Sequence, residues 1–338
     1  MRARDRRRGP SWTRHANPTV VFTVLVLAYT VLAMLTRALP LSNLVALIIV
    51  VSVPFLPALV LLLALILTWR RRKWLATAST IVLTATLALQ VPWYYICHPM
   101  DAREHLDLRV LSSNLLYGRA APAALVAIAR DSADLIVMSE LTSEAVDGFV
   151  KAGIQKDFPY SELRPREGAS GLGVWSKFPL IHAPTPKFDN SFLSARVRVP
   201  GLSHDPLIAS VHLPSPVAGG DTFEDWRRLI TAAKSEFAAY AEAAGPAAVI
   251  IAGDFNSTVD MRQFRDLLDV GYQEAVRQTG AGFGPTYSPH PRIPPLITID
   301  HVLTRNSTAT SIHTVDVPGS DHRALLATVA VPLDPANT

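Results

Sequence analysis

The sequence of 338 residues contains a single cysteine, Cys97. One cysteine excludes an internal disulfide framework and any cysteine-based zinc site. Acidic residues are nearly absent from positions 1–100, where Asp5 stands against eleven lysines and arginines, whereas the remaining chain carries 21 basic and 27 acidic residues. The net charge of +4 therefore hides a basic front and an acidic remainder, so the basic charge does not by itself indicate a nucleic-acid-binding domain.

Long runs without any charge fill most of this basic front. They extend over residues 19–36, 38–69 and 74–97. Each run reaches the ~20 residues that a helix needs to cross a bilayer. Three buried helices of a soluble domain would need polar faces at helical spacing, and these runs have none. A cleaved signal peptide is also disfavoured, because no small-x-small cleavage site follows the first run. We therefore expect three transmembrane helices.

The charges that flank these runs predict their orientation. Six arginines precede the first run, at positions 2, 4, 6, 7, 8 and 14, and Arg70, Arg71, Arg72 and Lys73 separate the second from the third. Only Arg37 lies between the first two runs. Since cytoplasmic loops collect lysine and arginine, we expect a multi-pass protein of the cell membrane whose C-terminal part lies outside the cytoplasm. The expected division is a basic cytoplasmic N-terminus (1–18), a three-helix anchor (19–97), a linker (98–106), a large domain (107–332) and a tail (333–338).

The large domain alternates predicted strands and helices, which indicates two packed sheets covered by helices. The helix at 221–244 begins with Asp221 and Glu224 in capping-box spacing and ends at Gly245-Pro246. The segment 280–295 is rich in glycine and proline and predicts a long loop, and loops of that length are often functional. The other expected helices cover residues 122–130, 143–149 and 262–268, and the strands cover 108–115, 133–139, 172–176, 194–199, 207–212, 248–252, 297–303, 311–317 and 324–331.

Polar residues directly follow the apolar runs at six places, where a sheet would present them at one edge. These places are Ser113-Asn114, Ser139-Glu140, Val211-His212, Gly253-Asp254-Phe255-Asn256, Ile299-Asp300 and Ser320-Asp321-His322. One such residue is usually a turn or cap residue, but six in one domain indicate a functional site. An oxygen-rich set without cysteine favours a hard cation such as Mg²⁺ over zinc.

The motifs around these residues resemble a known family. In order they are LRVLSSNLLYG, DLIVMSELT, SGLGVWSKFPL, IASVHLPSP, IIAGDFNS, ITIDHVL and GSDHRALLATV. This series is similar to the successive motifs of the endonuclease/exonuclease/phosphatase superfamily, which includes deoxyribonuclease I, abasic-site endonucleases, inositol polyphosphate 5-phosphatases and neutral sphingomyelinases. The resemblance implies an α/β four-layer sandwich with two central β-sheets flanked by helices. It also implies a metal-dependent phosphoric ester hydrolase that uses Mg²⁺, with Mn²⁺ as the alternative ion.

The resemblance further implies which residues bind the metal. Glu140 occupies the position of the principal metal ligand, although Ser139 replaces the more usual glutamine before it. Asn114 would complete the metal site or its water shell, and Asp321 would lie close to the metal. Taken alone, Asn114 could equally be a turn residue at a strand end.

Catalytic roles follow from the same resemblance. Asp254 would position or deprotonate the attacking water, and Asn256 would hold that water or a phosphate oxygen. His322 would donate a hydrogen bond to the phosphate, with Asp300 orienting its ring. His212 matches a histidine of the deoxyribonuclease, sphingomyelinase and 5-phosphatase branches, which argues against the abasic-site branch. His301 is expected on the opposite face of its strand, because successive strand residues alternate.

The substrate is the least constrained expectation. The membrane anchor and the acidic domain favour a lipid or envelope phosphodiester. An extracytoplasmic nuclease acting on DNA or RNA is the alternative, weakened by the lack of the basic stripe that backbone phosphates require. A catalytically inactive membrane scaffold is disfavoured, because Glu140, Asp254, Asn256, Asp300 and His322 are all present. No protein partner can be inferred from the sequence.

Overall fold

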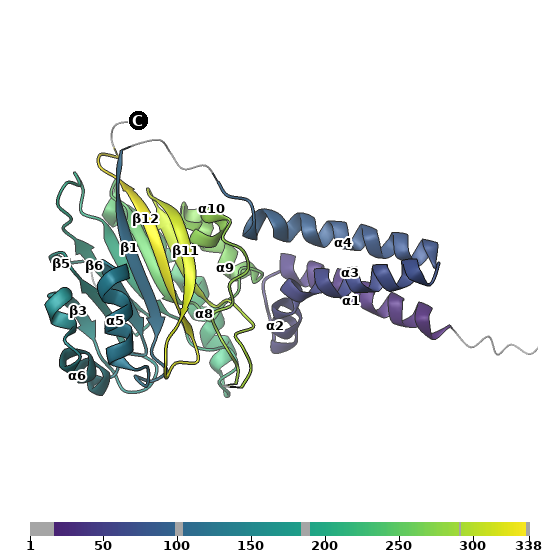
Figure 1. The fold of residues 1–338 in the computed structure, drawn as a ribbon, viewed down its shortest axis with the longest axis horizontal. Coiled ribbons are helices and arrows are strands. Elements are labelled where there is room, and N and C mark those ends of the chain that lie inside the picture. The colour runs from purple at the N-terminus through teal and green to yellow at the C-terminus, as the bar shows by residue number, and fades with distance from the viewer. Residues whose placement is uncertain (1–16, 99–103, 184–189, 291, 336–338) are drawn as a thin grey trace, which may run out of the picture.

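The computed structural model describes residues 17–98, 104–183, 190–290 and 292–335. A helical bundle and a larger α/β domain make up the described chain (Figure 1). The arginines at positions 2–14, most of the expected linker and the end of the tail lie outside the described residues.

The bundle contains the three predicted apolar segments. Within the described chain, the helices long and apolar enough to cross a membrane are Pro18–Ala38 with 21 residues, Leu44–Trp69 with 26 and Lys73–Tyr94 with 22. The first is α1 and the third is α4. The side chain of Asn17 caps α1 by accepting a hydrogen bond from the backbone N–H of Thr19, and a proline at the first helical position suits such a start.

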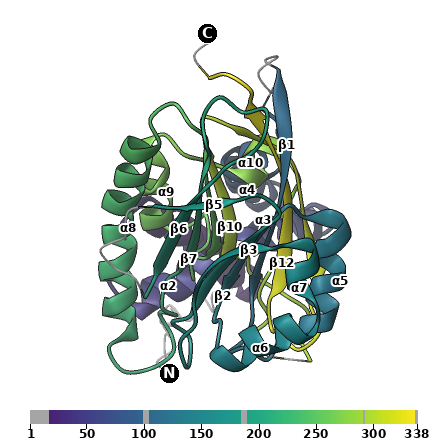
Figure 2. The same ribbon diagram turned by 90° about the vertical axis from the view of Figure 1, so that its left-hand side faces the viewer.

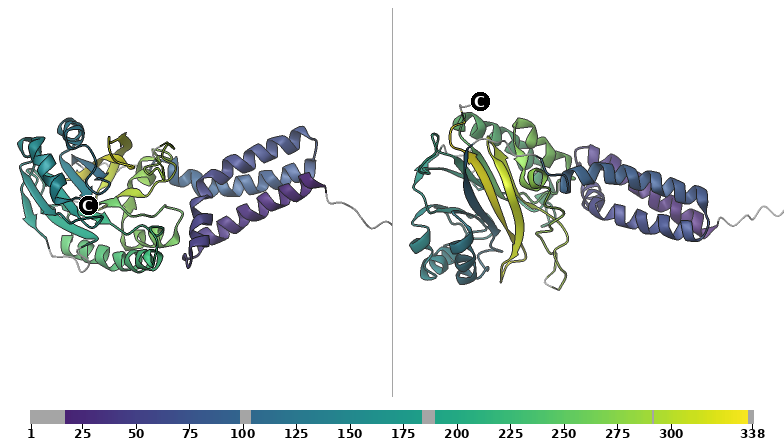
Figure 3. Two further views of the ribbon diagram at one scale, coloured as in Figure 1. Left: turned by 90° about the horizontal axis from the view of Figure 1, so that it is seen from below. Right: turned by 45° about the horizontal axis from the view of Figure 1, so that its top comes forward.

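The second segment, Leu44–Trp69, lies within the uncharged run at 38–69 and is interrupted near its middle. It consists of α2 (Leu44–Val51), a 3₁₀ turn (Val53–Phe55) and α3 (Leu56–Trp69). Pro54 and Pro57 lie at the break, and proline there removes hydrogen-bond donors from the helix. Figures 1 and 3 show α2 lying across the end of the bundle that faces the domain, whereas α1, α3 and α4 run side by side.

Two mixed sheets form the centre of the domain, and each has six strands among the described residues. The first has the order β11-β12-β1-β2-β4-β3, and the second β5-β6-β7-β8-β10-β9. The strands are β1 (His105–Asn114), β2 (Leu135–Ser139), β3 (Tyr160–Arg164), β4 (Leu172–Ser176), β5 (Leu180–His182), β6 (Phe192–Val197), β7 (Leu207–His212), β8 (Val249–Asp254), β9 (Gln273–Glu274), β10 (Asp300–Arg305), β11 (Thr308–Asp316) and β12 (Arg323–Pro332).

Alternating strand residues fill the layers on either side of each sheet. Val110 of β1 packs in the core between the sheets together with Ile250 of β8. Its neighbour Leu111 points to the other face, against α5 (Pro122–Ser132) and α6 (Ser143–Lys151). The long helix α8 (Thr222–Ala244) covers the outer face of the second sheet (Figure 2). The predicted four-layer sandwich with two central sheets is therefore confirmed.

Several element boundaries correct the sequence predictions. The strand expected at 194–199 is β6, and the one expected at 297–303 is β10, which begins only at Asp300. The capping box at Asp221 is wrong, because the side chain of Asp221 makes no capping hydrogen bond. Its backbone (φ −86°, ψ 15°) is not in the extended conformation that an N-cap side chain requires. The prediction missed the short elements β3, β5, β9, α7 (Ile154–Asp157) and α10 (Ala275–Thr279), and the expected helix at 262–268 is α9 (Arg262–Asp266) followed by a 3₁₀ turn.

Strand pairing brings the polar strand ends together. β1 and β2 are parallel, with Asn114 opposite Ser139, and β7 and β8 are parallel, with His212 opposite Asp254. β10 runs antiparallel to β8 and places Asp300 opposite Asp254. Side chains from both sheets therefore meet at one edge of the sandwich.

Candidate active site

A buried amide connects the two sheets at this edge. Nδ2 of Asn114, at the end of β1, donates to Oε1 of Glu140 and to Oδ2 of Asp254, each at 3.0 Å. All three residues are almost completely buried, with exposed fractions of 1%, 8% and 1% in that order. An asparagine that bonds two carboxylates from different sheets is a structural part of the cluster and more than a strand-end turn.

Two histidines point toward the carboxylate of Asp254. Nε2 of His212 lies 3.7 Å from Oε1 of Glu140 and 3.7 Å from Oδ2 of Asp254. Nε2 of His322 lies 3.7 Å from Oδ2 of Asp254 and 4.0 Å from Oδ1 of Asp321. Both imidazoles thus approach the same oxygen, Oδ2 of Asp254.

The second nitrogen of each histidine fixes its orientation. Nδ1 of His212 donates to the main-chain oxygen of Ala169 at 2.7 Å, which leaves Nε2 without a proton when the ring is neutral. Nδ1 of His322 bonds Oδ2 of Asp300 at 2.8 Å, and both side chains are buried. The expected Asp300–His322 pair is therefore present.

The crowding of charges shifts the pKa values of the cluster. Burial and the charge of Asp300 raise the pKa of Asp254, against the opposing charges of His322 and His212. Burial alone would lower the pKa of His322, but the charges of Asp300 and Asp254 and the hydrogen bond that His322 donates to Asp300 raise it to about 10. Burial likewise raises the pKa of Asp321, although His322 acts against it. Excess negative charge in a buried cluster is the electrostatic condition that favours a bound cation.

Two residues of the site, Glu140 and Asn256, have a left-handed backbone conformation. Glu140 has φ 59° and Asn256 has φ 46°, a conformation that costs energy for residues other than glycine. Each is held by hydrogen bonds: Oε2 of Glu140 accepts from the N–H of Tyr117 at 2.7 Å, and the N–H of Asn256 donates to Oδ1 of Asp254 at 2.8 Å. Gly253 (φ 144°) permits the close approach of β7 and β8, because a Cβ there would lie 2.0 Å from the main-chain oxygen of Val211.

The cluster has oxygen ligands for a divalent cation. Asp254, Asp300 and His322 can bring one ligand atom each within 4.8 Å of one another. However, His322 and Asp300 already bond each other, so their facing atoms are occupied. Oδ1 of Asp321 is buried and has no hydrogen-bond partner among the described residues. The orphaned oxygen of Asp321 and the carboxylate of Glu140 therefore suit a hard cation better.

The loop between α10 and β10 supplies residues that the sequence prediction did not name. The ring of Tyr287 packs against that of His322, with centroids 4.9 Å apart. The N–H of Ser288 donates to the main-chain oxygen of Asp321 at 3.1 Å, and Oγ1 of Thr286 accepts from the N–H of Asp300 at 3.3 Å. The long loop predicted at 280–295 thus forms one wall of the site, but nothing in the sequence distinguished Tyr287 within it.

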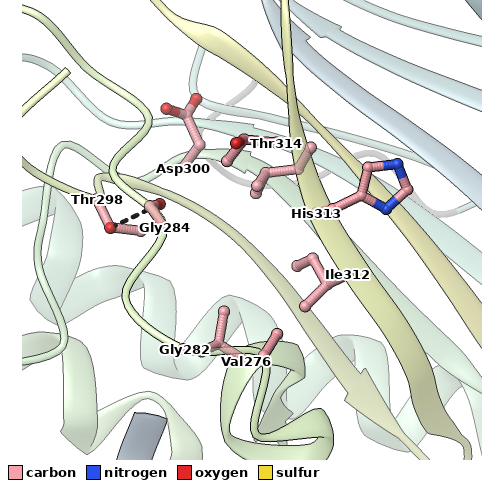
Figure 4. Close-up of a pocket in the computed structure, with 10 residues that line it drawn as sticks. Val276, Gly282, Gly284, Thr298, Asp300, Ile312, His313 and Thr314 are labelled. Atoms are coloured by element: carbon pink, nitrogen blue, oxygen red, sulfur yellow. Dashed lines mark hydrogen bonds between the residues drawn. The ribbon is translucent and has the colours of Figure 1, made fainter. Parts of the chain in front are cut away.

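Two neighbouring features lie outside the cluster. His301 turns to the opposite face, as predicted, where Nε2 donates to the main-chain oxygen of Ser257 at 2.9 Å. A mainly apolar cavity of about 180 Å³ lies between β11 and the segment 281–284, lined among others by Val276 and Ile312 (Figure 4). The carboxylate of Asp300, which also borders this cavity, points away from those apolar residues (Figure 4). The cavity is therefore separate from the converging histidines.

The buried acid–histidine cluster at one edge of the two mixed sheets is the candidate active site of the domain. The chain belongs to the Endonuclease/Exonuclease/phosphatase family, whose sequence profile matches residues 111–322. Members of this family are divalent-metal-dependent phosphodiesterases, nucleases and phosphatases. A comparison with curated protein sequences gives no match.

Solved structures share the fold at low sequence identity. An endonuclease/exonuclease/phosphatase from Beutenbergia cavernae is 20% identical, with a TM-score of 0.50, over 68% of this chain and 72% of that chain. One from Bacteroides vulgatus is 14% identical, with a TM-score of 0.54, over 67% and 99%. D. rerio TDP2 complexed with a single-strand DNA product is 16% identical, with a TM-score of 0.50, over 66% and 98%. These likenesses establish the fold and leave the substrate open.

Proposed function

We propose that this protein is a membrane-anchored phosphodiesterase that hydrolyses a lipid or envelope phosphoester outside the cytoplasm. The main observation in support of this proposal is that the apolar bundle packs directly on the domain that contains the acid–histidine cluster. A site fixed next to a bilayer meets lipid-borne groups at a high effective concentration. The acidic excess of residues 101–338 favours such a substrate over a long polyanion.

The metal set we assign is Glu140, Asp321 and Asn114, with Glu140 as the principal ligand. Mg²⁺, or Mn²⁺ as the alternative, would act there as a Lewis acid that polarises the phosphoryl group. The carboxylates of Glu140 and Asp321 supply hard oxygen ligands, while Asn114 orients Glu140 through its 3.0 Å hydrogen bond.

The catalytic groups act on the attacking water and on the phosphate. Asp254, whose raised pKa makes it a better base than an exposed aspartate, positions or deprotonates the water. Asn256 holds this water or a phosphate oxygen. His322 donates from Nε2 to a non-bridging oxygen and is kept protonated by Asp300. His212 contributes a second imidazole, 3.7 Å from Oδ2 of Asp254.

We further propose the topology that the flanking charges predict. The connection Arg70–Lys73 and the start of α1 lie at the end of the bundle away from the domain (Figure 1). Assigning this basic end to the cytoplasm puts the domain outside. The chain then consists of a cytoplasmic N-terminus (1–18), an anchor (19–97), a linker (98–106), a catalytic domain (107–332) and a tail (333–338).

The test uses the full chain reconstituted in nanodiscs with Mg²⁺. Turnover is compared on mixed phospholipid vesicles, plasmid DNA and single-stranded DNA at matched phosphodiester concentration and moderate salt. Asp254→Ala is the inactive control. We expect release of a phosphorylated or free head group that requires Mg²⁺ and is absent from the Asp254→Ala protein. Plasmid cleavage without any head-group release would refute the lipid assignment.

A nuclease is the second candidate. It is supported by the similar fold of D. rerio TDP2, which is described in complex with a single-strand DNA product. A nuclease should bind DNA with a steep salt dependence, because each neutralised phosphate releases counterions. For the lipid-directed enzyme we expect weak DNA binding with a shallow dependence on salt.

A further inference from the structure

Buried polar contacts bind the end of the helical bundle to the α/β domain. Nε of Arg37, in the last turn of α1, donates to Oδ1 of Asp260 at 2.6 Å. The side chain of Asp260 is 1% exposed and that of Arg37 13%. Just beyond α1, the main chain of Leu41 forms two hydrogen bonds with the side-chain amide of Gln263, at 3.1 and 3.0 Å. The bundle therefore binds the domain through non-covalent contacts as well as through the covalent chain.

Apolar side chains complete this interface. Residues of the bundle belong to the same buried cluster as Trp226 of α8 and Phe264 of α9. These bundle residues are Leu41, Leu47, Val50, Trp93 and Tyr94. A domain separated from the bundle would expose this apolar surface to water, which favours association or local rearrangement. The bundle thus covers part of the core of the domain.

The residue that Arg37 binds belongs to the loop that carries two proposed catalytic groups. This loop begins at Asp254, the last residue of β8, continues through Asn256 and reaches Asp260 at its far end. Its middle is held from inside the domain, because Nε1 of Trp226 donates to Oγ of Ser257 at 3.0 Å. Its far end is held by the bundle. Asn256 lies in this loop with a left-handed backbone (φ 46°), a conformation that costs energy for a residue other than glycine.

The carboxylate of Asp260 depends on Arg37. Its other oxygen, Oδ2, is buried and has no hydrogen-bond partner among the described residues. Burial raises the pKa of Asp260, and the charge and hydrogen bond of Arg37 act against this. Arg265, the other nearby cation, donates to the main-chain oxygens of Val259 and Asp260, at 2.9 and 2.7 Å, and to that of Arg37. Without Arg37, the buried carboxylate would lose its partner and the loop would have to move or take up a proton.

We propose that Arg37 is a positioning residue for catalysis: by binding Asp260, it holds the loop that presents Asp254 and Asn256 to the substrate. The helical bundle is then a part of the catalytic unit and more than a tether. This inference rests on the proposed roles of Asp254 and Asn256, and it does not depend on whether the substrate is a lipid or a nucleic acid.

The test is a double-mutant cycle in the full chain, in nanodiscs, with Arg37→Met, Asp260→Asn and both together. The substrate is bis(p-nitrophenyl) phosphate, a small soluble diester that does not need the membrane. Arg37→Lys, which keeps the charge, tests rescue, and Arg228→Met removes an exposed arginine that pairs with Asp225 on α8. Hydrogen exchange of residues 255–261 is measured for every variant.

We expect Arg37→Met to lower kcat about 10- to 100-fold with little change in KM, the size of effect that a small misplacement of catalytic groups produces. The fold-decrease in kcat of the double variant should be smaller than the product of the fold-decreases of the two single variants. Arg37→Lys should recover part of the rate, and Arg228→Met should have the kcat of the wild type. Exchange in the loop should rise only in the variants that break the pair.

Two results would overturn the proposal. One is a kcat for Arg37→Met, per folded protein, within twofold of the wild type. The other is unchanged exchange in residues 255–261 despite loss of the pair. If the wild type itself fails to cleave the diester with Mg²⁺, the proposed function fails instead, and loop exchange alone then decides whether Arg37 positions the loop.

Discussion

Replacing Asp300 by asparagine tests how much the pair with His322 contributes to catalysis. Asparagine keeps the size of the side chain and can still accept a hydrogen bond from Nδ1 of His322, but it removes the negative charge 2.8 Å away. Both side chains are buried, with exposed fractions of 2% and 7%. Water therefore cannot compensate for the missing charge, and His322 should lose the whole electrostatic stabilisation that Asp300 gives its protonated ring.

The size of the effect follows from the strength of a charged, buried hydrogen bond. Such a bond contributes about 1.5–3 kcal/mol. If this stabilisation acts mainly when the imidazolium faces the transition-state phosphate, kcat should fall by about 10- to 150-fold while KM changes little.

The pH profile gives a second, independent readout. The charge of Asp300 is one of the causes that raise the pKa of His322 to about 10. A divalent cation beside it would repel the imidazolium and lower that pKa in both proteins. Removing the charge of Asp300 lowers it further, so the protonated form is lost at a lower pH. The alkaline limb of kcat/KM should therefore move to lower pH in Asp300→Asn.

The assay measures kcat and KM against pH for the full chain, with circular dichroism to confirm folding. Asp316→Asn is a matched control, because Asp316 pairs with Arg323 next to His322 but its side chain is 83% exposed. The control should behave like the wild type. A folded Asp300→Asn protein with kcat within twofold of the wild type and an unmoved alkaline limb would refute the role of the pair.

Three other predictions follow from the site, the fold and the sequence. Glu140→Ala should raise the Mg²⁺ concentration needed for activity, so that high Mg²⁺ restores part of the rate; near-normal activity with an unchanged Mg²⁺ requirement would contradict the metal assignment. Burial alone would raise the pKa of Asp134, but its hydrogen bonds with Arg109 outweigh this and lower it. Because the pKa of Asp134 is lower in the folded than in the unfolded state, this stabilisation exists at neutral pH and is lost as the pH falls through the folded-state pKa. Asp134→Asn should therefore destabilise the fold by about 1 kcal/mol at pH 7, a value reduced for partial exposure, and the difference in free energy of unfolding should shrink below about pH 4. A reporter fused after Thr338 should be active if it is alkaline phosphatase, whereas strong fluorescence from a cytoplasm-only reporter would reverse the topology.

Much of the fold and site could be predicted because the signals are local. Asn114, His212 and Asp254 each end an apolar run that is long enough for a buried strand, and parallel pairing brings such ends to one edge. The short strands β3 and β5 were missed because they carry mixed polar and apolar residues without a clear period. The break between α2 and α3 was also not predictable, since prolines such as Pro54 are tolerated within membrane helices when neighbouring groups satisfy the freed backbone.

Contacts between distant parts of the chain were out of reach for sequence reasoning. Arg37 and Asp260 are 223 positions apart, and each has an ordinary local explanation: a charge between two apolar runs and an acid in a loop. In the proposed topology, Arg37 lies on the outer side, against the usual accumulation of positive charge in the cytoplasm. The pair with Asp260 explains why a positive charge is tolerated on this side of the membrane. Because the buried carboxylate of Asp260 neutralises the charge of Arg37, that charge does not need to face the cytoplasm or anionic lipid. If that is correct, the charge of Arg37 matters for the catalytic loop and not for orientation, so Arg37→Met should leave the topology of the reporter fusion unchanged while it lowers the rate.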